Sequence, residues 1–488
     1  CKSKIRSFPE NFVFGASTAA YQIEGGWDED GKSHSIWDTA THMQPSPIED
    51  ASTGDVAADS YHHYKRDVEM MKELNLDFYR FSVAWTRILP NGFADQINQA
   101  GIDYYNNLIN EMLDNNIQPF LTMYHWDLPQ NLQNLGGWAN PLSVNWFVDY
   151  ANILFQKFGD RVKRWITINE PKQICYEGYG SDAKAPFVNM SGIAEYICAK
   201  NILLAHAKAY RLYDEHYRVT QNGGIGISIS CTWYEPSSDV FDDQQAALDA
   251  RMFDWGQYAN PIFSKFGDFP EEVKKNIALK SAEQGFPRSR LPQLSKEEVV
   301  LIRGSSDFFG MNTYTSKLVY RDASLEGLYA VPSYNDDICG VFIKDPSWPQ
   351  AQSTWLQEVP WGFYKLLTEV RKLYDNPPVY ITENGWSTAG GLSDDDRVNY
   401  YKNYLNALLD AISEGSDVKG YTAWSLMDNF EWKHGYTEKF GLYEVDFSST
   451  EKTRTPRKSA FVYKEIIRTR ALNPDYEPEN FVEDNRKK

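Results

Sequence analysis

The chain alternates short, almost wholly apolar runs with longer segments in which apolar residues recur every three or four positions. The short runs are rich in β-branched and aromatic residues, which is typical of buried strands. Eight strands are predicted: Phe12–Ser17, Phe78–Trp85, Pro119–His125, Arg164–Asn169, Ile225–Trp233, Phe308–Tyr314, Val379–Glu383 and Tyr421–Leu426. The longer segments predict six helices: Asp59–Leu74, Ile102–Asn115, Val144–Phe158, Ile193–Tyr217, Pro360–Tyr374 and Asp394–Glu414.

Strands that alternate with helices predict βα units and a parallel sheet. Eight of them predict a sheet closed into a barrel, so the predicted fold class is α/β, a single-domain (β/α)8 TIM barrel with long βα loops. No linker or low-complexity segment divides the chain, which indicates one domain over residues 1–488, with a core at about 8–470 and a tail at 471–488. The irregular stretches Thr39–Thr53, Pro236–Gln244 and Asp322–Thr354 are predicted to be loops on the barrel face.

Polar and aromatic residues gather where the predicted strands end. They are Gln22 after the first strand, Arg80 on the second, His125 ending the third, Asn169 and Glu170 at the fourth, Asn312 and Tyr314 at the sixth, Glu383 and Asn384 at the seventh, and Trp424 on the eighth. In such barrels the C-terminal ends of the strands carry the chemistry. Each residue alone has a structural explanation, such as a satisfied core histidine or an ordinary buried ion pair. Their recurrence at one strand end after another favours a functional site there.

Two of these segments end on a carboxylate. Residues 163–171 read KRWITINEP and residues 377–385 read PPVYITENG, so Glu170 and Glu383 each stand at the tip of an apolar run. Burying a charge is unfavourable without partners, so an acid in this place calls for a function. Two carboxyl groups on separate strands are what cleavage of a glycosidic bond needs.

Composition narrows the range of partners. The net charge is −18, which argues against binding to nucleic acid or to anionic membranes, because both need basic patches. No apolar run of about 20 residues predicts a membrane-spanning helix. The chain has 15 Trp, 31 Tyr and 26 Phe. Most of these rings are expected in the core, and some can line a cleft, where they suit the C–H faces of sugars.

The cysteines and one sequon bear on the compartment. The five cysteines, at positions 1, 175, 198, 231 and 339, are odd in number and form no C-x-x-C pair, so neither a zinc site nor a dense disulfide framework is predicted. We expect them to be free and mostly buried thiols. Asn189-Met190-Ser191 would be a glycosylation site in a secreted chain. The predicted location is extracellular, with a signal peptide already removed.

Six segments make the chain similar to a known family. FVFGASTAAYQIEGGW, FYRFSVAWTRILP, MYHWDLPQ, TINEP, ITENG and WSLMDNFEW resemble glycoside hydrolase family 1, the β-glucosidase family, over about residues 8–470. The stretches YHWDLPQ, NFEW and GLYEVDF resemble its insect members. The resemblance implies that Glu170 is the general acid/base and Glu383 the nucleophile of a retaining double displacement. That mechanism requires the two carboxyl groups to lie about 5–5.5 Å apart.

The same resemblance implies roles for the surrounding residues. Arg80 and Tyr314 would keep Glu383 ionised, since a cation and a donated hydrogen bond both favour a carboxylate. Asn169 would hold the sugar 2-hydroxyl. The other residues implied to bind substrate are Gln22, His125, Asn312, Glu431 and Trp432 as polar partners, Trp424 as the stacking platform, Phe440 as a wall and Trp355 beside the leaving group. Glu431 would repel a phosphate and Phe440 replaces a tyrosine, so 6-phosphosugars are not expected.

The sequence determines the residues that would contact the leaving group less well. Lys184 and Lys317 could meet a charged aglycone such as the sulfate of a glucosinolate, or could be solvated rim lysines. The favoured function is a retaining β-glucosidase acting on terminal β-D-glucosyl residues. The alternatives are a β-thioglucosidase, an enzyme that prefers β-galactosides or β-fucosides, and a catalytically dead barrel that only binds. No cofactor and no metal are predicted. The predicted partner is a small β-glycoside, and a homodimer is a possible assembly.

Overall fold

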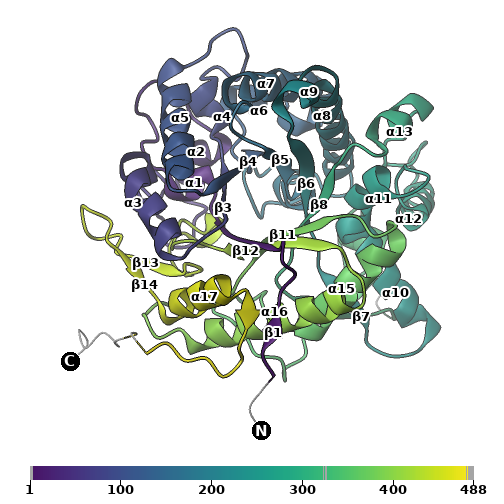
Figure 1. Ribbon diagram of the computed structural model, residues 1–488. Coiled ribbons are helices and arrows are strands. Elements are labelled where there is room, and N and C mark those ends of the chain that lie inside the picture. The colour runs from purple at the N-terminus through teal and green to yellow at the C-terminus, as the bar shows by residue number, and fades with distance from the viewer. Residues whose placement is uncertain (1–3, 323, 325–326, 480, 482–488) are drawn as a thin grey trace.

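The computed structural model describes residues 4–322, 324, 327–479 and 481. Its centre is a closed barrel of eight parallel strands, in the order β11-β12-β2-β3-β4-β5-β6-β8. The strands are β2 (Val13–Ser17), β3 (Phe78–Ser82), β4 (Gln118–Tyr124), β5 (Arg164–Asn169), β6 (Gly224–Ser230), β8 (Phe308–Asn312), β11 (Val379–Asn384) and β12 (Val418–Trp424). Figure 1 shows the strands around a central axis with helices outside them. The predicted fold class, a (β/α)8 TIM barrel, is confirmed.

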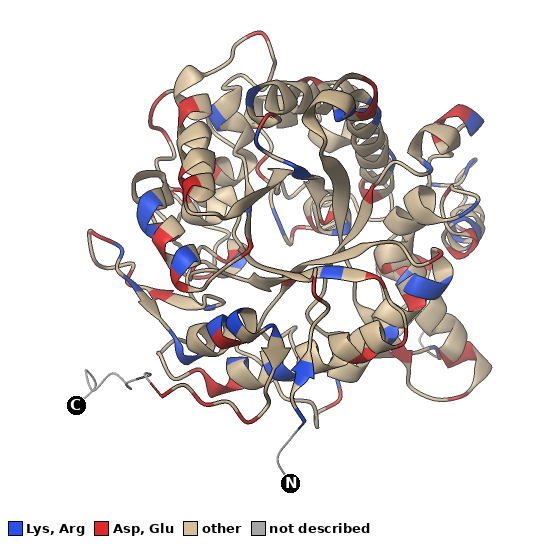
Figure 2. Cartoon of the chain, in the orientation of Figure 1, with Lys and Arg blue, Asp and Glu red and all other residues tan. Residues whose placement is uncertain are grey.

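The outer layer consists of amphipathic helices that pack their apolar faces on the strands. The long ones are α3 (Ser60–Glu73), α5 (Gln99–Asp114), α7 (Ser143–Phe158), α8 (Ala194–His216), α12 (Glu271–Glu283), α15 (Pro360–Leu373), α16 (Asp395–Ser413) and α17 (Lys458–Thr469). Shorter ones are α1 (Ala20–Ile23), α2 (Ile36–Thr41), α4 (Trp85–Ile88), α6 (Gln130–Gln133), α9 (Arg218–Gln221), α10 (Phe241–Arg251), α11 (Gln257–Phe263), α13 (Lys296–Ile302) and α14 (Tyr334–Ile338). Charged residues lie mainly on these helices and on loops (Figure 2).

Aromatic side chains close one end of the barrel. Phe78, Phe120, Ile166 and Phe308 form a separate buried cluster, and Val13 and Tyr380 pack against it. Phe120 lies with its ring centre 5.6 Å from that of Phe308. A Cβ atom at Gly15 would come within 2.4 Å of the Phe78 ring, so only glycine fits there. The N-terminal ends of the strands are therefore packed with side chains.

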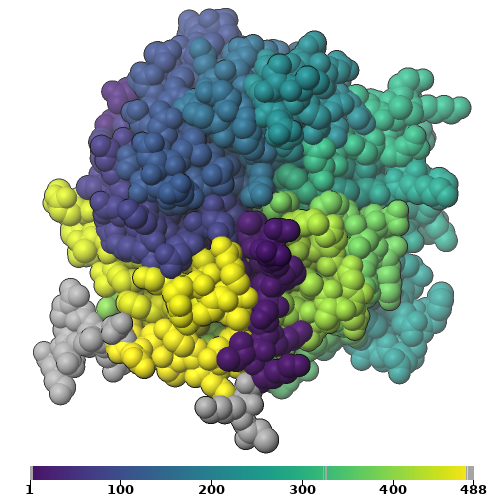
Figure 3. Space-filling view, viewed as in Figure 1, coloured from purple at the N-terminus to yellow at the C-terminus, as the bar shows by residue number. Residues whose placement is uncertain are grey.

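Three small sheets lie outside the barrel. The strands β7 (Trp233–Pro236), β9 (Ser316–Tyr320) and β10 (Val341–Ile343) form one sheet, and β13 (Tyr443–Val445) pairs with β14 (Arg454–Pro456). The strand β1 (Arg6–Ser7) pairs antiparallel with β15 (Ala471–Leu472), which joins the two ends of the described chain. Figure 3 shows the purple N-terminal segment against the yellow C-terminal one. Short helical turns are η1 (Gly137–Ala139), the π-helices η2 (Gln173–Gly180) and η3 (Met252–Gly256), and η5 (Trp432–His434).

Some predicted boundaries are wrong. The strand predicted at Ile225–Trp233 ends at Ser230, and Trp233 begins β7 instead. The stretch predicted as a loop from 322 to 354 contains α14 and β10, while its residues 323, 325 and 326 lie outside the described residues. The single-domain division stays a prediction, and most of the last nine residues of the tail are not described. Among the described residues, no helix combines the length and apolarity needed to cross a membrane.

The prediction of free cysteines is wrong for two of the five. Cys175 and Cys198 form a disulfide that ties η2 to α8 across 23 positions of the sequence. Pairing over this distance depends on how η2 and α8 pack, and no local pattern reports that. Cys231 is a buried free thiol and Cys339 an exposed one, and Cys1 lies outside the described residues.

Candidate active site

Glu383, the predicted nucleophile, is held by two donors at the end of β11. Arg80, fully buried on β3, places Nη1 2.6 Å from Glu383 Oε1. The Tyr314 hydroxyl donates to Oε2 at 2.7 Å. Both oxygens of the carboxyl group therefore accept hydrogen bonds, which fix the direction in which the group points. Burial raises the pKa of Tyr314 well above its usual range, so its hydroxyl stays a neutral donor.

Glu170, the predicted acid/base, sits in a different environment just after β5. Its backbone has φ of 55°, in the left-handed region that side chains rarely adopt, and such strain is commonly found at functional sites. Asn312 Nδ2 donates to Glu170 Oε1 at 2.9 Å. Burial, and then the negative charge of Glu383, raise the pKa of Glu170 to about 8. This group is therefore protonated at neutral pH and can donate a proton.

Asn312 hydrogen-bonds one glutamate and stands opposite the other in the sheet. In the register of β8 and β11 it lies opposite Glu383, and its Nδ2 donates both to Glu170 and, at 2.9 Å, to Asn169 Oδ1. Thr382 donates from its hydroxyl to Asn312 Oδ1 at 2.6 Å, which fixes the orientation of the amide. The Glu170 carboxyl group is thus tied to the strand that neighbours the one carrying Glu383.

The hydrogen-bond network leaves His125 a free donor. Arg80 Nη2 and Asn312 Nδ2 both donate to Asn169 Oδ1, so the Asn169 nitrogen faces His125 Nε2 at 3.0 Å. His125 Nε2 must accept there, which places its ring proton on Nδ1. Nδ1 is buried and has no hydrogen-bond partner in the described part of the chain, and the same is true of Gln22 Oε1. Buried polar atoms without partners are costly, and the hydroxyls of a sugar would satisfy them.

The remaining pocket residues come from the segment after β12. Gln22 Nε2 lies 3.4 Å from Glu431 Oε2 and 2.8 Å from the carbonyl oxygen of Phe430. Burial and the neighbouring Glu438 raise the pKa of Glu431 to about 8. The rings of Trp424 and Trp432 both lie 5.9 Å from that of His125.

One cavity of about 660 Å³ unites most of the predicted site residues. Its lining includes His125, Glu170, Asn312, Tyr314, Trp355, Glu383, Trp424, Glu431, Trp432 and Phe440. Arg80, Asn169 and Gln22 are not in the lining but each hydrogen-bonds a residue that is. All thirteen predicted residues therefore meet at one end of the barrel. Among the described residues, no group of three or more His, Cys, Asp or Glu side chains is arranged to hold a metal ion.

The outer part of the cavity is lined by lysines. Lys172 pairs with Asp254 at 3.0 Å and Lys184 with Glu177 at 2.9 Å. Trp355 is 38% exposed, with its ring 5.5 Å from Tyr314. Other lining residues were not predicted from the sequence, among them Ser230, Cys231, Thr232, Lys433 and His434. The first three were assigned to a strand that ends at Ser230, and their place just after that strand would have indicated the site.

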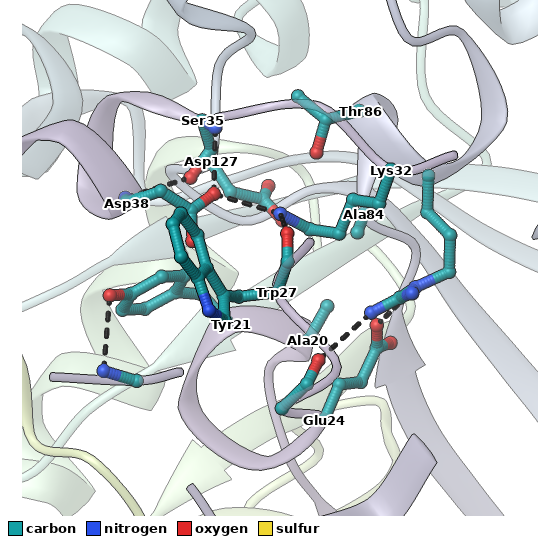
Figure 4. A pocket seen from close by; sticks show the side chains of 13 residues that line it. Ala20, Tyr21, Glu24, Trp27, Lys32, Ser35, Asp38, Ala84, Thr86 and Asp127 are labelled. Atoms are coloured by element: carbon teal, nitrogen blue, oxygen red, sulfur yellow. Dashed lines mark hydrogen bonds and ion pairs between the residues drawn. The ribbon is translucent and has the colours of Figure 1, made fainter. Parts of the chain in front are cut away.

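A second, much smaller polar cavity is lined by other residues (Figure 4). It holds about 10 Å³ of free space, the room for roughly one water molecule. Lys32 pairs there with Asp38 at 2.8 Å, and Arg87 with Glu24 at 3.0 Å. Burial raises the pKa of Asp127 to about 8. No sugar ring fits this space, so its carboxyl groups do not form a second catalytic pair.

A parallel eight-stranded barrel with two buried glutamates, both lining one cavity at the carboxyl ends of the strands, is the architecture of a glycoside hydrolase. Comparison with known families agrees, because the model of glycosyl hydrolase family 1 matches residues 4–472. The chain belongs to this family and is a glycoside hydrolase.

Individual relatives span nearly the whole chain. Myrosinase 1 of Brevicoryne brassicae is 47% identical over 465 residues, which cover 95% of this chain and 98% of that protein. The human cytosolic β-glucosidase is 42% identical over 96% of this chain and 99% of its own length. The solved structure of aphid myrosinase superimposes with a TM-score of 0.91 at 46% identity, covering 96% of this chain and all of the other.

Proposed function

We propose that this chain is a retaining β-glucosidase that removes the terminal non-reducing β-D-glucosyl residue from aryl and alkyl glucosides and short β-linked oligosaccharides. The observation that carries the proposal is the contrast between two buried glutamates. Glu383 is held on both of its oxygens, by the Arg80 guanidinium and by the Tyr314 hydroxyl. The pKa of Glu170 is raised to about 8 by burial and by the charge of Glu383, which favours its protonated form. The two environments differ in the way that a nucleophile and a proton donor require.

The reaction proceeds in two displacements. Glu383 attacks the anomeric carbon while Glu170 gives its proton to the departing oxygen, and a covalent glycosyl-enzyme forms with inversion. Esterification removes the negative charge of Glu383, so the pKa of Glu170 falls. Glu170, now a carboxylate, takes a proton from water, and the water attacks the same carbon with a second inversion. The net result is retention, and both glutamates return to their starting states.

The preference for glucose is supported by Glu431 and Gln22. A pocket built to hydrogen-bond a hydroxyl penalises a sugar that lacks it or directs it elsewhere. The test is kcat/KM for p-nitrophenyl β-glucoside, β-galactoside and β-fucoside, together with NMR of the first anomer released. β-Glucose as the first product supports the proposal, and α-glucose contradicts it. Absence of turnover on every glycoside would instead favour the dead-barrel alternative.

A second candidate function is favoured by the charge of Lys317. This side chain lines the outer cavity, and within the described ranges no carboxylate lies at ion-pair distance from it. Its pKa is lowered by burial and then by the positive charge of Lys172. A half-buried cation with no ion-pair partner among the described residues is unfavourable, and an anionic leaving group would stabilise it. The candidate is a β-thioglucosidase acting on substrates with a sulfated aglycone, such as glucosinolates.

Replacing Lys317 by Met tests this candidate. For a phenyl β-glucoside that carries a sulfonate, we expect kcat/KM to fall about 10-fold, because a hydrogen bond to a charged group is lost. For the uncharged phenyl β-glucoside, we expect kcat/KM to stay the same. Lys433→Met is the matched control, since Lys433 lines the same cavity but donates to the Asp182 carbonyl oxygen. Equal losses on both substrates would rule out charge recognition by Lys317.

We also propose that the protein is secreted and glycosylated. The Cys175–Cys198 disulfide supports an oxidising compartment, and Asn189 of the sequon is exposed. Protein from a secretory host should lose mass on treatment with an N-glycan-removing enzyme, and Asn189→Gln should abolish that loss. If the wild-type protein has the same mass before and after the enzyme treatment, it is not glycosylated. The homodimer stays a prediction.

A further inference from the structure

Two tyrosines of α16 meet behind Tyr314. Tyr400 donates its hydroxyl hydrogen to the Tyr314 carbonyl oxygen at 2.6 Å, and Tyr404 donates to the same oxygen at 2.9 Å. Their rings stack with centres 4.1 Å apart, and both side chains are buried. A carbonyl oxygen has two lone pairs, so these two donors saturate it.

Each hydroxyl also accepts a hydrogen bond from the active-site wall. Asn384, the residue after Glu383, donates from Nδ2 to the Tyr400 hydroxyl at 2.8 Å. Val359 donates its backbone N–H to the Tyr404 hydroxyl at 3.1 Å. Val359 ends the segment that carries Trp355. The pair therefore ties three parts of the site to α16: the strand of the nucleophile, Tyr314, and the leaving-group segment.

The Tyr314 backbone depends on these contacts. Residue 314 lies between the end of β8 at Asn312 and the start of β9 at Ser316, so no strand ladder holds its carbonyl group. Burial raises the pKa of Tyr400 well above its usual range, and that of Tyr404 is raised as well, so both stay neutral donors. The hydrogen bonds donated by Tyr400 and Tyr404 therefore fix the orientation of the Tyr314 carbonyl group.

We propose that Tyr400 and Tyr404 are positioning residues for catalysis, acting through Tyr314 on the hydrogen bond that Tyr314 donates to Glu383. The inference rests on the proposed role of Glu383 as nucleophile. Tyr314 Oη lies 2.7 Å from Glu383 Oε2, and a displacement of about 1 Å in such a group can lower a rate about 100-fold. α16 thus acts on the reaction through Tyr314, although no described side chain of this helix lines the cavity.

Tyr400→Phe and Tyr404→Phe test the proposal, because each removes one oxygen atom and keeps the stacked ring. We expect kcat on p-nitrophenyl β-glucoside to fall about 10-fold in each and about 100-fold in the double variant, with KM changed little. The acidic limb of the kcat/KM profile should move to higher pH, because the hydrogen bond that the displaced Tyr314 donates to the attacking carboxylate is weakened.

Tyr463→Phe is the matched control. Its buried hydroxyl donates to the Gly15 carbonyl oxygen at 2.7 Å in the barrel wall, away from Tyr314. This variant should lose comparable thermal stability and keep the wild-type pH profile. An unchanged kcat and acidic limb in both Tyr400→Phe and Tyr404→Phe would overturn the proposal.

A double-mutant cycle with Tyr314→Phe separates positioning from general destabilisation. If Tyr400 acts through the Tyr314 hydroxyl, its removal should add little once that hydroxyl is gone. If Tyr314→Phe strongly lowers kcat and Tyr400→Phe lowers it by the same factor with or without the Tyr314 hydroxyl, only the positioning role is overturned. An ineffective Tyr314→Phe would instead contradict the assignment of the active site itself.

Discussion

Glu383→Gln is expected to lower kcat on p-nitrophenyl β-glucoside by about 10⁴-fold or more, over 5 kcal/mol of barrier. An amide has nearly the size and shape of the carboxyl group but cannot attack the anomeric carbon. The variant also leaves Arg80, whose Nη1 lies 2.6 Å from Glu383 Oε1, without its buried counter-charge. Stability should therefore be measured by thermal unfolding beside the kinetics, and the loss of rate should exceed anything that unfolding explains.

Glu24→Gln is a matched control for this loss. Glu24 is a buried carboxylate that pairs with buried Arg87 at 3.0 Å, much as Glu383 pairs with Arg80, but it faces the small cavity instead of the large one. It should cost stability and leave kcat within about 10-fold of the wild type. Near-normal turnover by Glu383→Gln would refute the proposed mechanism, and so would equal losses in the two variants.

The barrel was predictable because its strands are buried on both faces. Such strands appear in the sequence as continuous apolar runs, and all eight predicted runs form barrel strands. The small sheet of β7, β9 and β10 was missed because its strands are short and only partly buried. The Cys175–Cys198 bond was missed for another reason: it depends on the packing of η2 against α8, and no local pattern in the sequence records that.

The site was predictable where its residues stand at strand ends. Glu170 and Glu383 interrupt apolar runs, which makes them conspicuous in the sequence. Tyr400 and Tyr404 are not conspicuous, because two buried tyrosines four positions apart on an amphipathic helix look like ordinary core residues. Only the geometry of their hydroxyl groups separates them from the rest of the core. Which ring nitrogen of His125 carries the proton could likewise not be predicted from the sequence, because it depends on the orientation of the Asn169 amide.

Glu170→Ala is expected to reduce activity most on substrates whose leaving group must be protonated as it departs. A poor leaving group, as in an alkyl β-glucoside, needs protonation and should lose about 10²–10⁴-fold in kcat/KM, whereas 2,4-dinitrophenyl β-glucoside should lose little in that parameter. In the wild type the pKa of Glu170 is raised to about 8, so the rate should fall as pH rises through that value and the acid deprotonates. The variant should lack this basic limb.

Azide then identifies the stereochemistry. With Glu170 gone, no base activates water, so the glycosyl-enzyme on Glu383 persists and a small anion in the vacated space can attack it. Turnover of the dinitrophenyl substrate should rise with azide concentration and give β-glucosyl azide, because two inversions restore the starting configuration. Glu177→Ala is a suitable control: this carboxylate lines the same cavity but pairs with Lys184, and azide should not accelerate that variant. An α-azide product would establish a single inversion, and the assignment of Glu383 as a covalent nucleophile would then be wrong.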